Sequence, residues 1–256
     1  MSEIDKEKKA VIEFKDFGFQ YFSQAEPTLS NINLTIYKGE KVLIAGASGS
    51  GKSTLGNCLN GLIPFAYKGE ITGSLKIDGK ETKESTIFEL SKKVGTVLQD
   101  SDGQFIGLTV GEDIAFALEN DCVAQSSMKE TVQHAADIVD MGALLKSSPY
   151  ELSGGQKQRA AIAAALAGDP VLLFADEPTT ALDVITQAGI LKLLNRLRRE
   201  RNLAVLLVSH DLPMAASVAS RMFVMKDGFI LEEGTPAKVV RSPEHPYTRR
   251  LVEAAL

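Results

Sequence analysis

Long apolar runs are missing from this 256-residue sequence, and no stretch approaches the roughly 20 residues that a membrane-spanning helix needs. The charged amino-terminal stretch MSEIDKEKKA also lacks the apolar core of a secretory signal. We therefore expect any association with a membrane to be peripheral.

Cysteine and basic charge are also limited. Neither Cys58 nor Cys122 has metal-ligand spacing or a nearby histidine, so we interpret both as reduced, buried thiols of a cytosolic protein. The net charge is −5, and no block of lysine and arginine is long enough to act as a polybasic arm. A nucleic-acid partner is therefore not expected.

The order of apolar patterns predicts an α/β fold. VIEFKDFGFQY and NINLTIYKGE alternate as strands do, and they predict an antiparallel β region ahead of the buried strand KVLIAG. A helix is expected after GSGKST to about Leu62, followed by the strand and turn GSLKIDGK. Later apolar strands, VLLFAD and LAVLLVSH, alternate with helical patterns, which indicates a mostly parallel sheet covered on both faces.

Helical periods dominate residues from about 100 to 165, as in TVGEDIAFALEN and SMKETVQHAADIVDMGALL, and they predict a helical subdomain inserted in the α/β core. Near the end, RMFVMKDGFILEEG is typical of a hairpin. We interpret residues 1–256 as one domain with its core at 11–98 and 168–235, a helical subdomain at about 99–167 and a helical tail at about 236–256.

The segment GASGSGKST fits the phosphate-binding loop pattern G-x-x-x-x-G-K-[ST], and it lies between an apolar strand and a helix as that pattern requires. Backbone amides of such a loop cradle phosphates, Lys52 would reach the β and γ groups, and the Ser53 hydroxyl would ligate Mg²⁺. The candidate ATP-binding residues of this loop are Gly46, Ala47, Ser48, Gly49, Ser50, Gly51, Lys52, Ser53 and Thr54.

Two adjacent carboxylates, Asp176 and Glu177, close the strand VLLFAD. Such a pair alone is typical of a helix cap or a solvated turn. Because ligands of α/β sheets collect at the carboxyl ends of the strands, a phosphate loop in the same chain favours a functional interpretation. Asp176 is then placed to hold Mg²⁺ through water, and Glu177 to orient or deprotonate the attacking water.

A second candidate anion site follows in ELSGGQKQR, where a serine and two glycines precede an alanine-rich helical run. The LSGGQ pentapeptide, followed by DEP and TALD, resembles the nucleotide-binding subunit of ATP-binding cassette (ABC) proteins over essentially the whole chain. The resemblance implies a P-loop NTPase core of the RecA-like kind. It also implies that Ser153, Gly154, Gly155 and Gln156 contact the ATP held by a second subunit, so that two subunits pair head to tail.

Further positions follow from the same resemblance. Tyr21 resembles the aromatic residue that stacks on adenine, with Phe19 as the alternative. Gln99 resembles the glutamine that touches Mg²⁺ or water and links the core to the helical subdomain, although Gln104 lies close in sequence. Asp183 resembles the aspartate that couples the two sites, and His210 the histidine that contacts the γ-phosphate, although it could instead cap a helix. His134 and His245 match nothing and are expected at the surface.

Three functions fit a chain with these motifs: the ATPase subunit of a membrane transporter, a soluble ABC protein of DNA repair or translation, and a phosphate-loop kinase or switch protein. LSGGQ disfavours the third, and a single cassette without a heptad run disfavours the second. We therefore expect an ATPase at the cytoplasmic face of the cell membrane, paired with itself or with a related subunit.

Two stretches point to different importers. LQDSDGQFIGLTVGEDIAFALEN resembles the ATPases of energy-coupling factor (ECF) importers of vitamins and metal ions. That resemblance implies a transmembrane coupling protein and substrate-binding membrane subunits as partners. The tail SPEHPYTRRLVEAAL instead resembles the ending of oligopeptide-importer ATPases, although such an ending could simply cap a last helix. The ECF type is favoured, and the oligopeptide type is kept as the alternative.

Overall fold

Two stacked β-sheets organise the chain in this computed structural model, which describes residues 9–100, 102–180, 182–209 and 216–255. The first sheet is antiparallel, with the strand order β2-β1-β4-β5, and it confirms the predicted amino-terminal β region. Its strands are β1 (Ala10–Tyr21), β2 (Leu29–Tyr37), β4 (Gly69–Ile77) and β5 (Lys80–Glu81).

The second sheet has the order β10-β9-β3-β8-β7-β6 and is parallel except for its edge strand β10, as the sequence predicts. β9 and β10 form the predicted hairpin, in which Asp227 and Gly228 have φ of +49° and +79°, as a tight hairpin turn requires. Its strands are β3 (Lys41–Ala45), β6 (Val94–Val97), β7 (Leu172–Asp176), β8 (Ala204–Ser209), β9 (Arg221–Lys226) and β10 (Phe229–Gly234).

Both faces of the second sheet are buried, which explains why its strands read as continuous apolar runs. In β3, Val42 and Ile44 pack into a cluster with the first sheet, whereas Leu43 and Ala45 pack into a cluster that includes the helices after residue 110. Neighbouring strands β7 and β8 alternate in the same way. The sheet is therefore a rigid central layer whose strand ends can position side chains accurately.

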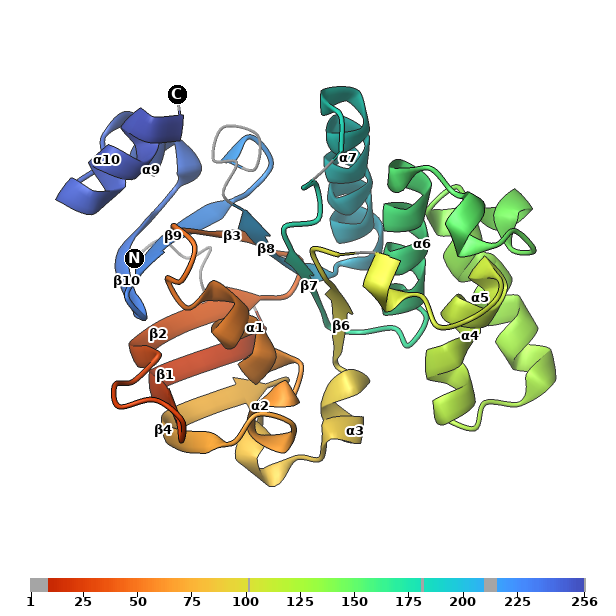
Figure 1. Cartoon of the computed structure of the whole chain (residues 1–256), viewed down its shortest axis with the longest axis horizontal. Coiled ribbons are helices and arrows are strands. Elements are labelled where there is room, and N and C mark those ends of the chain that lie inside the picture. Colours follow the sequence, from red (N-terminus) through yellow and green to blue (C-terminus); the bar gives the residue numbers. More distant parts are fainter. Residues whose placement is uncertain (1–8, 101, 181, 210–215, 256) are drawn as a thin grey trace.

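Three longer helices, α4, α5 and α6, pack against one another beside β6, at the end of the molecule opposite the first sheet (Figure 1). α4 begins with a capping box in which Thr109 and Glu112 satisfy each other's backbone amides. The helices of this and the following regions are α4 (Val110–Asn120), α5 (Gln125–Ile138), α6 (Gly154–Leu166), α7 (Val184–Arg201), α9 (Pro236–Arg241) and α10 (Pro246–Ala255).

Two helices end earlier than the sequence pattern predicts. α1 (Lys52–Leu59) stops before Leu62 because Gly61 adopts φ +81°, after which α2 (Leu62–Phe65) and α3 (Ile87–Ser91) are short. α5 ends at Ile138, because Asp140 adopts φ +61° and the chain continues as a 3₁₀ turn at Gly142–Leu144. In both places a left-handed residue stops a helix whose apolar periodicity continues.

The two cysteines differ in environment. Cys58 in α1 is buried, as expected, and burial raises the pKa of its thiol. Cys122, just after α4, is exposed, so the expectation of a buried thiol is wrong there. It lies at φ +54° in the turn after α4, where the chain reverses at the surface. Among the described residues, none of the helices combines the length and apolar character needed to cross a bilayer.

Gly56 in α1 offers a test of how tightly the helix after β3 is packed. A Cβ at this position would collide with the ring of Phe174 in β7, whereas a Cβ on Gly168 would meet nothing within 4 Å. We expect Gly56→Ala to lower the free energy of unfolding by about 1–3 kcal/mol through overpacking, although alanine alone favours a helix by about 1 kcal/mol. Chemical denaturation measures this, with Gly168→Ala as a near-neutral control; equal stability of the two variants would contradict the packing.

Candidate nucleotide-binding site

Strands of the second sheet bring the candidate residues to one edge. β3 runs directly into residues 46–53, which we call the phosphate loop, while β7 ends on Asp176 and β6 is followed by Gln99. β3, β8, β7 and β6 are successive parallel neighbours. Because the carboxyl ends of parallel strands share an edge, residues far apart in the chain meet there.

Glycines shape the phosphate loop. Gly49 and Gly51 have φ of +79° and +101°, which side-chain-bearing residues rarely adopt. Gly46 packs so closely on the carbonyl oxygen of Met225 that a Cβ would collide with it. Gly51 is also the N-cap of α1, whose first amides have no partner within the helix. The loop therefore presents backbone N–H groups and a helix start, the features that bind phosphate.

Lys52 folds back over the phosphate loop and is buried, with an exposed fraction of 7%. Its ammonium donates hydrogen bonds to the carbonyl oxygens of Gly46 (2.8 Å) and Ala47 (2.7 Å) and to Ser50 Oγ (3.2 Å). Burial lowers the pKa of Lys52, while the nearby charges of Glu177 and Asp176 oppose that shift. A buried cation thus lies inside the loop, where it can pair with a phosphate.

Ser53 and Asp176, both predicted near Mg²⁺, are in contact. Ser53 Oγ donates a hydrogen bond to Asp176 Oδ2 at 3.1 Å. Burial raises the pKa of Asp176, and the neighbouring charge of Glu177 adds to this, against the opposing effects of Ser53 and Lys52. A hydroxyl and a carboxylate in contact at a strand end, with the amide of Gln99 on the same cavity, form an oxygen donor set that Mg²⁺ accepts.

A cavity of about 550 Å³ collects most of the predicted residues. Tyr21 lies on its wall and its hydroxyl is 3.3 Å from Thr54 Oγ1, whereas the alternative, Phe19, is buried and packs edge-on against the Tyr21 ring. The geometry thus favours Tyr21 as the aromatic wall. The lining residues are Tyr21, Gln24, Thr28, Gly46, Ser48, Gly49, Gly51, Lys52, Ser53, Thr54, Gln99, Asp176 and Glu177.

Gln99 and Gln104, which the sequence leaves close together, have different positions. Gln99 lines the cavity, whereas the side-chain oxygen of Gln104 accepts a hydrogen bond from the backbone N–H of Leu98 at 3.0 Å. Gln104 thereby holds the segment that presents Gln99. Two further lining residues, Gln24 and Thr28, come from the β1–β2 connection, and sequence reasoning missed them because that connection carries no motif.

Glu177 follows β7 with φ +50°, an uncommon backbone value for a residue with a side chain. Its backbone N–H donates to the Val208 carbonyl oxygen at 2.9 Å, and its carboxylate accepts a hydrogen bond from Thr180 Oγ1 at 3.0 Å. These contacts enforce the strained conformation and direct the carboxylate to the cavity wall. Strain of this kind is concentrated at functional positions in proteins.

Ser153, Gly154, Gly155 and Gln156 of the LSGGQ segment, which we call the signature, lie away from this cavity. Ser153 is the N-cap of α6 and forms a capping box with Gln156. Gly155 lies against the side chain of Thr186 in the first turn of α7, where a Cβ would approach Thr186 Cγ2 to 2.5 Å. Gly154 lies next to Leu182. The signature and the start of α7 therefore form one surface, and none of the four signature residues is among those that line the nucleotide cavity.

Asp183 caps α7 on that same surface. Its carboxylate accepts hydrogen bonds from the backbone N–H groups of Ile185 and Thr186, both at 3.0 Å, and from Thr186 Oγ1 at 2.6 Å. The hydrogen bond from the Thr186 hydroxyl is the main cause that lowers the pKa of Asp183. His210, the remaining predicted catalytic residue, lies outside the described residues.

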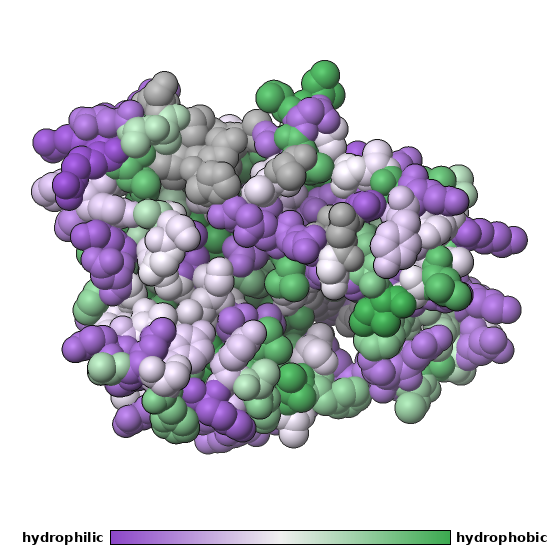
Figure 2. All heavy atoms as spheres, viewed as in Figure 1, coloured by the Kyte–Doolittle hydropathy of each residue, from purple (hydrophilic) through white to green (hydrophobic). Residues whose placement is uncertain are grey.

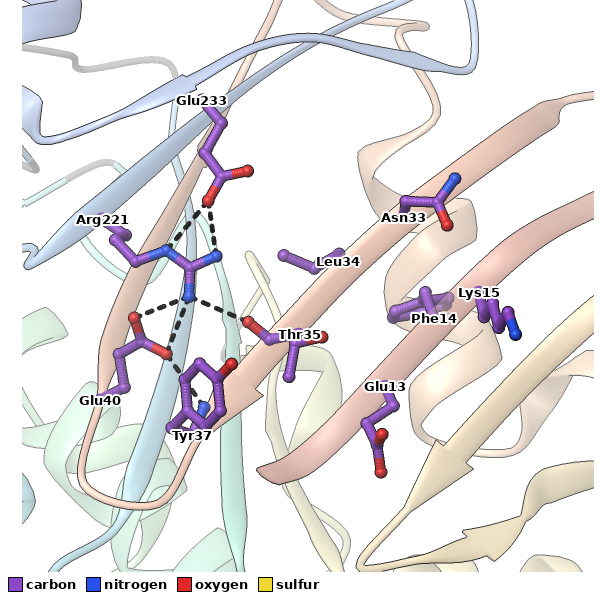
Figure 3. Close-up of a pocket in the computed structure, with 10 residues that line it drawn as sticks. All are labelled: Glu13, Phe14, Lys15, Asn33, Leu34, Thr35, Tyr37, Glu40, Arg221 and Glu233. Atoms are coloured by element: carbon purple, nitrogen blue, oxygen red, sulfur yellow. Dashed lines mark hydrogen bonds and ion pairs between the residues drawn. The ribbon is translucent and has the colours of Figure 1, made fainter. Parts of the chain in front are cut away.

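A second and larger cavity, of about 680 Å³, is lined by residues of β1 and β2 in the first sheet and of β9 and β10 in the second, and contains none of the predicted residues (Figure 3). Arg221 in β9 bridges its wall by donating to Glu233 Oε1 (2.7 Å), Glu40 Oε1 (3.0 Å) and the Thr35 carbonyl oxygen (3.0 Å). The guanidinium thus links β2, β9 and β10. We interpret this cluster as a structural tie between the sheets.

The fold and this site define a nucleotide-binding α/β domain with a phosphate loop. A family model described as ABC transporter matches residues 29–180, more than half of the chain. Proteins described as ABC transporter ATP-binding proteins from Clostridium perfringens and Enterococcus faecalis are 52% and 50% identical over 92% and 91% of this chain. The chain belongs to the ABC transporter family, as an ATP-hydrolysing, ATP-binding domain.

The chain spans 42% and 41% of the length of those two relatives. Among solved structures, CbiO1 from Clostridium perfringens, described as part of the ABC transporter complex cbiONQ, superposes with a TM-score of 0.83. It shares 29% sequence identity with this chain, and the alignment covers 98% of this chain and 96% of CbiO1. The likeness therefore extends over both sheets, the helical region and the tail.

The raised pKa of Asp176 predicts a conflict between stability and function. Because the folded chain holds the Asp176 proton more tightly than the unfolded chain, the carboxylate lowers stability as the pH rises through its folded-state pKa. We expect Asp176→Asn to raise the melting temperature of the nucleotide-free protein at pH 7, with a smaller gain near pH 4, around the ordinary aspartate pKa of about 3.9. It should weaken Mg²⁺-dependent ATP binding.

Thermal unfolding at the two pH values and ATP titrations with and without Mg²⁺ provide the measurements. Asp169→Asn is the matched control, because the Asp169 side chain is 88% exposed. A lower melting temperature of Asp176→Asn at pH 7 would show that the carboxylate is stabilising and would contradict this account.

Proposed function

We propose that this chain is the ATPase of a membrane importer, in which two ATPase domains pair head to tail with ATP at their interface. The observation that carries this proposal is the separation of the two phosphate-binding features. The phosphate loop lines the cavity, whereas Ser153 and Gln156 lie on the surface formed with α7. A signature that cannot reach its own cavity needs a second domain to act on.

Exposed apolar residues on the signature surface support the pairing. Val184 and Ile185, at the start of α7, are 71% and 85% exposed. They lie directly after Asp183 and beside the signature, so burial against a second domain would remove a favourable amount of apolar surface from water. Whether the second domain is another copy or a related chain, the same surface would be buried.

Within this proposal, each candidate site residue has one role in the transfer of the phosphoryl group from ATP to water. Tyr21 would stack on the adenine ring, and the phosphate loop and Lys52 would bind the phosphates. Ser53, Gln99 and Asp176 would hold Mg²⁺, which supplies charge neutralisation at the phosphate oxygens. Glu177 would accept a proton from the attacking water, with His210 supporting it at the γ-phosphate.

A groove at the helical region supplies the site for a membrane partner. Ile87 and Phe88 of α3 and Phe116 of α4 line a cavity of about 540 Å³, and all three are more than 40% exposed. Ile106 and Leu108, 71% and 81% exposed, lie on the segment between Gln99 and α4. Figure 2 shows apolar side chains at the surface over this segment. We call the groove and the exposed residues of this segment the docking patch; it consists of Ile87, Phe88, Ile106, Leu108 and Phe116.

The docking patch suits an apolar segment of a transmembrane coupling protein, which would place the chain peripherally at the cytoplasmic face of the membrane. Its position beside Gln99 allows closure of the nucleotide site to move the partner. The division into a core at 11–98 and 168–235, a helical subdomain at 99–167 and a tail at 236–256 is part of this proposal, supported by the packing of α4 on α5 and α6.

The ECF type, importing a vitamin or a metal ion, is the finer part of the proposal. It rests on the stretch LQDSDGQFIGLTVGEDIAFALEN and on the likeness to CbiO1 of the cbiONQ complex over nearly the whole of both chains. Affinity purification of the chain from a detergent extract tests it. Small substrate-binding membrane subunits and a coupling protein should accompany the chain, whereas oligopeptide-importer membrane subunits would favour the alternative.

Glu177→Gln separates ATP binding from hydrolysis. We expect the variant to bind ATP and to elute as a dimer when ATP is present. Its kcat should be about 100-fold or more below that of the wild type, because the general base is lost. Phosphate release and size-exclusion chromatography with ATP measure these effects, with the exposed Glu200→Gln as control. Undiminished hydrolysis by Glu177→Gln would contradict the role, and full activity of a strictly monomeric wild type would contradict the pairing.

The docking patch is tested by a matched pair of substitutions. Phe116 in α4 and Phe229 in β10 are each 45% exposed, and they lie in opposite halves of the molecule. We expect Phe116→Ser to reduce co-purification of the membrane subunits while ATP binding is unchanged, and Phe229→Ser to leave both unchanged. Equal recovery of the subunits with both variants would place the partner elsewhere.

A further inference from the structure

The carboxyl-terminal helix α10 contacts the phosphate loop, a contact across 200 positions of sequence. The backbone N–H of Ala47 donates a hydrogen bond to the hydroxyl oxygen of Tyr247 at 3.1 Å. Tyr247 lies in the first turn of α10, within the stretch EHPYT, which the ATPase motifs do not explain. The tail thereby supplies a side chain to the loop that the rest of the site is built on.

The start of α10 is fixed by Glu232 of β10. Its two carboxylate oxygens accept hydrogen bonds from the backbone N–H groups of Glu244 (2.9 Å) and His245 (3.0 Å). Glu232 is 8% exposed; burial favours protonation, but the hydrogen bonds outweigh it and keep the pKa of Glu232 below its ordinary value. A buried, ionised carboxylate thus anchors the helix start.

The Tyr247 side chain is held in turn by its neighbours. His245 Nδ1 accepts a hydrogen bond from the Tyr247 backbone N–H at 3.1 Å, so His245 caps the helix. From the sequence we expected His245 at the surface, whereas it is partly buried. The Lys226 ammonium lies 5.4 Å from the centre of the Tyr247 ring. The backbone and ring of Tyr247 are therefore held by His245 and Lys226, while its hydroxyl reaches Ala47.

Both backbone polar groups of Ala47 form hydrogen bonds to side chains. Its carbonyl oxygen accepts from Lys52 at 2.7 Å and its N–H donates to Tyr247. Gly46 and Ser48 line the nucleotide cavity, but Ala47 is not among the lining residues. Tyr247 therefore holds the loop from outside the cavity, where it does not compete with a nucleotide.

We propose that Tyr247 is a positioning residue, which keeps the phosphate loop in its binding conformation when Lys52 turns from the loop carbonyls to the nucleotide. This inference rests on the proposed ATP chemistry of the same site. Lys52 donates hydrogen bonds to the carbonyl oxygens of Gly46 and Ala47, and its transfer to a phosphate would remove them. The hydrogen bond that the Ala47 N–H donates to the Tyr247 hydroxyl does not involve Lys52 and would persist through that exchange.

Tyr247→Phe removes the hydroxyl and retains the ring. Because the loop is positioned before chemistry begins, we expect the KM for ATP to rise about three- to tenfold, the effect of one neutral hydrogen bond, with kcat unchanged. Hydrogen exchange of the Ala47 amide, followed by NMR in the nucleotide-free protein, should be faster in the variant. The Leu55 amide, which donates to Gly51 within α1, should exchange equally slowly in both proteins.

Tyr37→Phe is the control, because Tyr37 lines the other cavity (Figure 3). An unprotected Ala47 amide in the wild type, or equal Ala47 exchange in wild type and Tyr247→Phe, would overturn the contact. Faster exchange with an unchanged KM would overturn the positioning role. A wild-type chain that fails to bind ATP would contradict the proposed function instead, and Ala47 exchange would still decide the contact.

Discussion

The buried ammonium group of Lys52 is the interaction on which the site depends. Removing a cation from water is costly unless oxygen atoms surround it, and the carbonyls of Gly46 and Ala47 with the hydroxyl of Ser50 fulfil that need. Those oxygens converge because Gly49 and Gly51 adopt left-handed conformations and Gly46 lies directly on the chain of Met225. The loop thus encloses a positive charge that its own oxygen atoms stabilise, and the same charge can pair with a phosphate.

The second sheet places the phosphate loop and the signature on two separate surfaces of the domain. The parallel strands β3, β7 and β6 of this sheet bring the loop, Asp176 and Gln99 to one cavity, and the hydrogen bond between Ser53 and Asp176 joins two of these strand ends. α6 and α7 present the signature and Asp183 on a separate surface, tied together by Thr186. Pairing of two domains would join one surface to the other, so catalysis and association would share the same residues.

Local patterns predicted much of the fold and most of the residues that line the nucleotide cavity. The phosphate loop, the carboxylates at the end of β7 and the capped start of α6 each lie within a few residues of a strand end or helix start. Continuous apolar runs mark the strands of the second sheet that are buried on both faces. Contacts between segments that lie far apart in the sequence could not be predicted from local patterns. Gln24 and Thr28 reach the cavity through a connection without a motif, Tyr247 reaches Ala47 through tertiary packing, and His245 is partly buried for the same reason. The shorter helices α1 and α5 reflect left-handed residues that periodicity does not reveal.

Because the two cysteines differ in exposure, the native chain has a single accessible site for a spectroscopic label among its cysteines. Cys58 in α1 is enclosed in the core, where burial keeps its sulfur protonated and unreactive, whereas Cys122 is exposed to solvent between α4 and α5. A thiol-directed fluorophore would therefore attach selectively at the turn of the helical region without any engineered residue. Rotation of that region against the sheets during a nucleotide cycle would become visible as a change in emission from the native polypeptide.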